Sequence, residues 1–102
     1  MNMSDLMKQA QQFQEKLAAV QTDLGNRQVT GSAGAGMVVV TFNGRCELLD
    51  LTIEPALVQP ENTGMLQDLV TAAVNDGLNK ARELSKTEMA RLTGGLNIPG
   101  LL

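Results

Sequence analysis

The chain has 102 residues, of which 43% are hydrophobic, and its eight basic and eleven acidic side chains give a formal charge of −3. A chain of this length folds as one domain, residues 1–102, with a core too small to enclose a large active site. The single cysteine excludes an intrachain disulfide, and the absence of histidine removes the usual neutral-pH proton carrier and a common metal ligand.

Residues 4–25 form the first predicted helix. Ser4 is a candidate N-cap, Gly25 is a candidate C′ residue, and no helix breaker lies between them. The apolar residues recur at alternating steps of three and four, which predicts one narrow coiled-coil stripe: Met3, Leu6, Ala10, Phe13, Leu17, Val20 and Leu24. The other faces are rich in glutamine and carry few charges, unlike a membrane-surface helix.

The segment from Val29 to Ile53 is predicted to form a three-stranded antiparallel meander. We assign the first turn to Gly31–Gly36 and the second, of type I′, to Asn43-Gly44. Residues 37–42 between them are a β-branched run typical of a central strand. In the third strand the apolar residues alternate with polar ones, so one face should point to a core: Leu49, Leu51 and Ile53.

The second helix is predicted to begin between Pro60 and Thr63 and to end at Thr93, before two glycines. Its first half carries a wide apolar face of the kind that lies on a sheet, and its second half carries a thinner one. Glu88 falls within the later apolar arc. It either reaches a cation across a helix pair or protrudes into solvent, and we prefer the second interpretation.

The predicted lengths of the elements indicate how the chain assembles. About thirty helical residues span about 45 Å, whereas a seven-residue strand is only about 23 Å long, so half of the second helix must overhang the sheet. Its apolar stripe would then lie in water unless it pairs with the first helix or with a second copy of the chain. We therefore predict a homodimer with projecting helical arms and flexible ends at residues 1–3 and 95–102.

Few residues are suited to catalysis. The glycines from Gly31 to Gly36 precede a strand and lack the lysine of a phosphate-binding loop, which favours a hairpin turn. The serines have no histidine to activate them. Cys46, assigned to a strand just past the second turn, is expected to be an inert filler. We expect no enzyme activity, no cofactor and no metal. The N-terminus lacks the features of a signal peptide and no apolar run reaches the ~20 residues of a membrane span, so we expect a soluble, cytoplasmic protein.

Acidic residues occupy the middle of the chain and basic residues dominate its C-terminal part. Between Cys46 and Asp76 every charge is negative, and after Asp76 four basic side chains outnumber two acidic ones. One interpretation is solvated helix faces with intrahelical pairs, such as Glu83 with Lys86 or Lys80. The alternative is a basic end that contacts phosphates, since two copies would present eight basic side chains there. Both interpretations are open at this point.

Five segments, taken together and in order, carry a resemblance that covers nearly the whole chain. They are the Gln-rich first helix with Met7-Lys8-Gln9-Ala10, the turn Gly31-Ser32-Ala33-Gly34, Asn43-Gly44, the run Ala72-Ala73-Val74-Asn75-Asp76, and the ending Leu92-Thr93-Gly94-Gly95-Leu96 with Pro99-Gly100-Leu101. The chain resembles the YbaB/EbfC family of bacterial nucleoid-associated proteins. Gly77 stands where members of that family usually have alanine, which should cost about 1 kcal/mol of helix stability.

The resemblance implies an α+β protomer of order α-β-β-β-α and a tweezer-like homodimer. It also implies binding to duplex DNA with little base reading, at the nucleoid, with effects on nucleoid organisation and gene regulation. The side chains expected to contact DNA phosphates are Lys80, Arg82, Lys86 and Arg91, joined by Lys8, Lys16 and Arg27. The competing hypothesis is a protein-interaction module, in which the acidic body or the apolar tail docks to a replication or repair protein and DNA contact is incidental.

Overall fold

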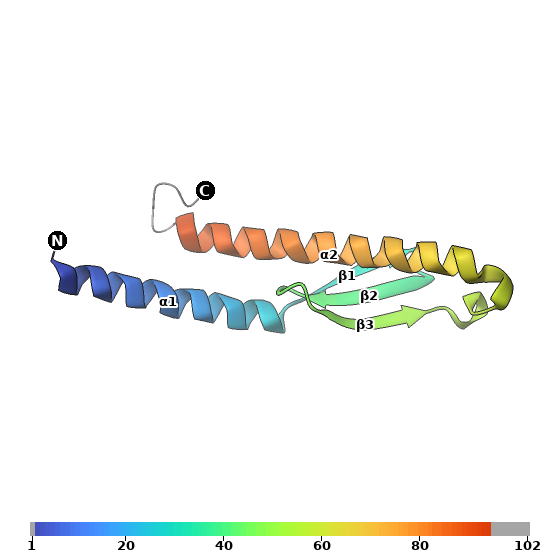
Figure 1. Ribbon diagram of the computed structural model, residues 1–102, viewed down its shortest axis with the longest axis horizontal. Coiled ribbons are helices and arrows are strands. Elements are labelled where there is room, and N and C mark those ends of the chain that lie inside the picture. Colours follow the sequence, from blue (N-terminus) through green and yellow to red (C-terminus); the bar gives the residue numbers. More distant parts are fainter. Residues whose placement is uncertain (1, 95–102) are drawn as a thin grey trace.

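The computed structural model describes residues 2–94 as an elongated molecule of 69 × 22 × 17 Å, with two long helices and a small sheet at one end (Figure 1). Its radius of gyration is 19.4 Å, against about 13 Å for a compact chain of this length. The elements are α1 (Met3–Asn26), β1 (Gln28–Ala33), β2 (Val38–Asn43), β3 (Leu48–Ile53) and α2 (Thr63–Gly94), with 3₁₀ turns at Pro55–Leu57 and Pro60–Asn62. The predicted α-β-β-β-α order is confirmed. Met1 and the predicted flexible segment 95–102 lie outside the described residues.

Helix α1 begins earlier and ends differently than predicted. The Asn2 side chain, rather than Ser4, caps the helix, because its oxygen accepts a hydrogen bond of 2.8 Å from the Asp5 amide. Asparagine and serine cap helices equally well, so the sequence did not distinguish the two positions. At the other end Gly25 lies inside the helix, and the chain leaves it through Arg27 in an extended conformation.

The first hairpin turn is shorter than predicted. Positive φ angles occur at Gly34, Ala35 and Gly36, whereas Gly31 belongs to β1 and pairs with Val40 of β2. Gly31 is required for close packing and not for the turn. A methyl group at this position would collide with the Gly77 backbone and would lie 2.6 Å from the Ala73 carbonyl oxygen. Two glycines facing each other thus let α2 lie against β1 with its backbone almost touching the strand.

The core lies between α2 and the first two strands. Its fully or almost fully buried side chains are Val38, Val40, Phe42, Leu57, Ala73 and Ala81. Gly77 belongs to the same face of α2, where a methyl group would lie 2.7 Å from Val40 Cγ2 and 2.8 Å from Phe42 Cδ2. The glycine found where relatives were expected to carry alanine therefore accommodates the Val40 and Phe42 side chains of β2.

Strand β3 departs from the prediction that one of its faces points to a core. Leu51 pairs with the buried Val40 and faces the same side of the sheet, but it is 42% exposed because α2 covers mainly β1 and β2 (Figure 1). Leu48 and Leu49 are each 49% exposed, and a bulge places both of them opposite the step from Thr41 to Phe42. Within residues 2–94, only Ile53 of this strand is even partly buried.

The second hairpin has a four-residue loop, residues 44–47, so the predicted two-residue type I′ turn at Asn43-Gly44 is wrong. The positive φ angle of 63° falls on Cys46, which lies in this loop and not in a strand. The Asn43 side-chain oxygen accepts hydrogen bonds from the amides of Arg45 and Glu47. Gly44 instead permits a close approach, since its amide donates to the Leu24 carbonyl at 2.8 Å. The loop thereby fixes the end of α1 against the sheet.

Candidate nucleic-acid interface

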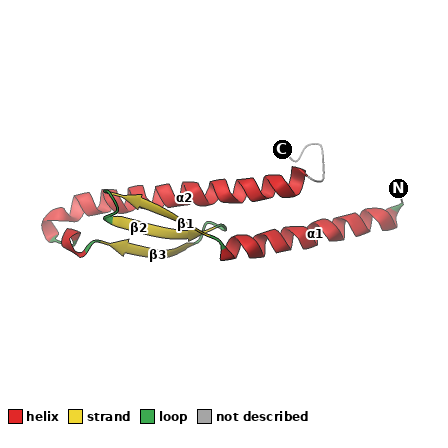
Figure 2. Cartoon of the chain, turned by 180° about the vertical axis from the view of Figure 1, so that it is seen from behind, coloured by secondary structure: helices red, strands yellow, loops and turns green. Residues whose placement is uncertain are grey.

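Beyond the sheet, α2 continues alongside α1, and together they form the arm of the molecule, residues 3–26 and 82–94. The two helices run in opposite directions, so the first turn of α1 and the last described turn of α2 lie toward the same end of the molecule (Figure 2). The α1 stripe is half-buried at Phe13, Leu17 and Val20 and fully buried at Leu24. Its first part, from Met3 to Ala10, is exposed, because α1 extends past the last described turn of α2.

The sheet end of the molecule, which we call the body, comprises residues 28–81. Six acidic residues and no basic one lie between positions 46 and 79. The arm carries most of the basic residues. Because the arm also carries five acidic residues, it is neutral overall and lies next to an acidic body.

Arg82 and Lys86 lie one turn apart on the arm part of α2, and both side chains are exposed. At 100° per residue they lie on the side of the helix away from Ala81 and Gly77, which are buried. Lys8 and Lys16 are likewise exposed on α1. Within residues 2–94 these four side chains form no ion pair.

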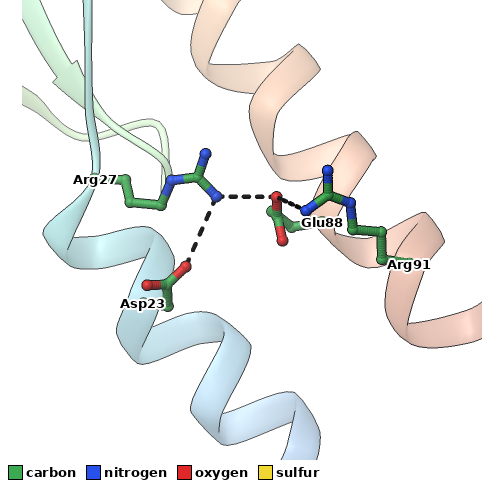
Figure 3. A network of polar contacts seen from close by, with 4 residues as sticks. All are labelled: Asp23, Arg27, Glu88 and Arg91. Atoms are coloured by element: carbon green, nitrogen blue, oxygen red, sulfur yellow. Dashed lines mark hydrogen bonds and ion pairs between the residues drawn. The ribbon is translucent and has the colours of Figure 1, made fainter.

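The other predicted contact residues are engaged by carboxylates. Lys80 Nζ lies 3.1 Å from Asp76 Oδ2. Arg27 Nη1 lies 2.9 Å from Glu88 Oε1 and 3.8 Å from Asp23, and Arg91 Nη1 lies 3.3 Å from the same Glu88 oxygen (Figure 3). The interpretation of Glu88 as a residue protruding into solvent is wrong, since its side chain is only 15% exposed and reaches across the helix pair.

Asp76 links α2 to β1 within the body. Its Oδ2 accepts a hydrogen bond of 3.1 Å from the Ser32 amide of β1 and a second one from Lys80. The Ser32 amide, followed by Lys80, lowers the pKa of the Asp76 carboxyl below its usual value of 3.8. Sequence reasoning did not single out this residue, because its partner on β1 is 44 positions away.

A shallow apolar groove of about 340 Å³ lies at the far end of the body. It is lined by Val58, Gln59, Pro60, Thr63, Leu66 and Gln67. None of these side chains titrates near neutral pH, and the one hydroxyl in the lining, that of Thr63, donates a hydrogen bond to the Pro60 carbonyl. In residues 2–94 no three potential metal ligands of the His, Cys, Asp or Glu types come together. Neither described helix has a stretch apolar enough to cross a membrane.

Comparison with known proteins decides the family. A profile of the YbaB/EbfC DNA-binding family matches residues 1–96. The chain belongs to this family. Among its relatives, the nucleoid-associated protein DP1429 of Desulfotalea psychrophila is 55% identical over 99% of this chain and 95% of its own length. A nucleoid-associated protein of Pelotomaculum thermopropionicum is 49% identical over 98% and 95% of the two chains.

The fold of this YbaB/EbfC protein is also found in a solved structure. The crystal structure of the uncharacterized protein HP0035 from Helicobacter pylori matches it with a TM-score of 0.85 and 29% identity, over 92% of this chain and 99% of that one. The α+β fold and the resemblance inferred from the sequence are thereby confirmed. In this family member, the seven predicted contact residues divide into four unpaired and three paired side chains within the described part of the chain.

Proposed function

We propose that this protein is a nucleoid-associated protein that binds duplex DNA as a homodimer, through phosphate contacts from its arms. The observation that carries the proposal is the exposed pair Arg82 and Lys86 on the arm, which form no ion pair within residues 2–94. Membership in a DNA-binding family and the names of the relatives support it. The protein would then act at the nucleoid and affect its organisation and gene regulation.

Duplex DNA fits the arms better than a single strand does. Proteins that hold single strands stack bases on exposed aromatic side chains. This chain has two aromatic residues, of which Phe42 is 4% exposed and Phe13 is half-buried in the α1 stripe. The arms instead present lysine and arginine, which contact phosphates and carry little base information. Binding should therefore depend weakly on base sequence, with any preference arising from DNA shape.

A second copy of the chain accounts for the exposed face of β3. Leu48, Leu49 and Leu51 continue the apolar surface of β2, yet each is more than 40% exposed in a single chain. A patch of this kind, beside a strand whose Val38 and Val40 are fully buried, is typical of a subunit interface. A two-fold axis at this face would cover the leucines and double the number of basic side chains offered to DNA.

The experiment is a mobility shift with wild type and the double variant Arg82→Ala/Lys86→Ala, over a series of salt concentrations and on several duplex sequences. The wild-type affinity should fall steeply with salt, with a log–log slope of about −0.9 per phosphate neutralised. The double variant should bind every sequence more weakly, and its slope should be shallower by about 1.8 per protomer.

The matched control is Arg82→Lys/Lys86→Arg, which exchanges the two side chains and preserves their charge. It should bind nearly as wild type does, since phosphate contacts by a lysine and an arginine on this open face are alike in charge. A wild-type affinity that does not change with salt, or an alanine variant that binds as tightly as wild type, would contradict the proposal.

A further inference from the structure

Two arginines from separate segments converge on one carboxylate oxygen at the base of the arm. Arg27 follows α1, Arg91 lies on α2, and both Nη1 atoms point to Glu88 Oε1, at 2.9 and 3.3 Å (Figure 3). Two guanidinium groups around one oxyanion are also the arrangement in which proteins hold a phosphate group. In the free protein the carboxylate of Glu88 fills that place.

The two arginines are accessible from outside, and Glu88 lies behind them. The side chains of Arg27 and Arg91 are 43% and 74% exposed, against 15% for Glu88. Each guanidinium has five N–H groups, and each of the two uses a single nitrogen for its contact with Glu88. A DNA phosphate approaching the arm can therefore reach both arginines without moving a helix.

The charges of the cluster cancel. Arg27 and Arg91 carry two positive charges, and Asp23 and Glu88 carry two negative ones. These four side chains should therefore attract a phosphate less strongly than Arg82 and Lys86 do. Both groups contain two basic side chains, but only Arg27 and Arg91 are neutralised by carboxylates.

We propose that Glu88 limits the DNA affinity of this protein by occupying Arg27 and Arg91 in place of DNA phosphates. The inference rests on the proposed function, since it assigns a regulating residue to the same DNA-binding arm. Glu88 is here an intramolecular competitor: phosphates must share or replace its contacts before the two arginines add to binding. The negative charge of Glu88 makes it compete with phosphates, and the size and shape of its side chain maintain the contact between α1 and α2.

The variant Glu88→Gln separates charge from shape, because the amide keeps an oxygen acceptor for Arg27 and a side chain of the same size. It should bind duplex DNA more tightly than wild type in low salt. Its log–log slope should be steeper by about 0.9 for each arginine released, which adds about a threefold to fourfold loss of affinity per arginine between 50 and 200 mM salt.

The matched control is Glu83→Gln, which removes the same charge from an exposed position five residues earlier on α2. Glu83 forms no ion pair within the described residues, so its loss releases no arginine and should leave the slope unchanged. In the Glu88→Gln background, adding Arg91→Ala should remove part of the gained affinity and reduce the slope by about 0.9.

In the wild-type background, Arg91→Ala should change the slope less than Lys86→Ala does, and this comparison does not depend on how well Glu88→Gln folds. The proposal is overturned if Glu88→Gln and Glu83→Gln change binding equally, if Glu88→Gln binds more weakly while its circular dichroism is unchanged, or if Arg91→Ala costs as much as Lys86→Ala. A wild-type protein that does not bind DNA would instead overturn the proposed function itself.

Discussion

The two halves of α2 use the same helix in opposite ways. Over the sheet, the buried residues of its inner face are small: Ala73, Gly77 and Ala81. Along the arm, Arg82 and Lys86 are exposed, and the side facing α1 is only partly covered at Leu84 and Leu92. The body half brings backbones close together, and the arm half holds charges out in solvent.

This difference predicts where each half tolerates change. In the body, backbone atoms of α2 are the nearest neighbours of a side-chain atom added at Gly31, so there is little room to relax. In the arm, an exposed charge can be exchanged with little effect on folding, typically within about 0.5 kcal/mol. Body variants should therefore change stability, and arm variants should change DNA binding.

The largest effect is expected from Gly31→Ala. The new methyl group would collide with the Gly77 backbone and with the Ala73 carbonyl, and neither can move without shifting α2. Overpacking of this kind costs about 1–3 kcal/mol and sometimes more, and we expect the upper end because the obstacles are backbone atoms. The urea midpoint of unfolding measures the change.

Gly64→Ala is the control for this variant. Gly64 lies in the first turn of α2, and a methyl group there meets no atom within 4 Å. Its stability should stay the same or rise by less than about 1 kcal/mol. If Gly31→Ala were as stable as Gly64→Ala, the close approach of α2 to β1 would be wrong.

A smaller effect, on assembly, is expected from Leu51→Asp. If a second copy covers β3, a charge at this position is buried without a partner, and the dimer dissociation constant should rise at least about 30-fold. Sedimentation velocity at micromolar concentration should then show monomers. DNA affinity should fall as well, because the two arms no longer act together.

Leu6→Asp is the comparison in the arm. Leu6 is 49% exposed on α1, similar to the 42% of Leu51, but it lies far from β3 (Figure 1). This variant should remain dimeric. Equal dissociation of both variants, or of neither, would place the subunit contact elsewhere.

The sequence predicted the elements of both regions, since periodicity and turn residues are local signals. It did not predict the structural role of individual glycines. Gly31 and Gly44 read as turn residues, whereas both allow close backbone contact with a segment that is distant in sequence. Glycine has the same local signature in either role, so only the tertiary structure distinguishes them.

The residues of the candidate site could likewise be predicted only in part. The pair Arg82 and Lys86 could be found from their spacing, because residues four apart share one face of a helix. The engagement of Arg27 by Glu88 could not, since the two are 61 positions apart and meet only because the Gly44 loop fixes the end of α1. Ion pairs between distant segments leave no periodic pattern in a sequence.

The smallest effect is expected from Asp76→Asn, at the contact between α2 and β1 within the body. The folded protein holds the pKa of Asp76 below 3.8, because the Ser32 amide and Lys80 favour the charged carboxylate. Its stabilising contribution is therefore present above pH 3.8 and is lost as the pH falls through the lowered value. Asp76→Asn should unfold at slightly less urea than wild type at pH 7, and the two should converge below pH 3.8, as the Asp76 carboxyl becomes protonated. Asp68→Asn, on the same helix but without an ion pair in residues 2–94, should not show this convergence. A constant difference between Asp76→Asn and wild type from pH 7 to pH 2 would mean that the aspartate acts through its shape and not its charge.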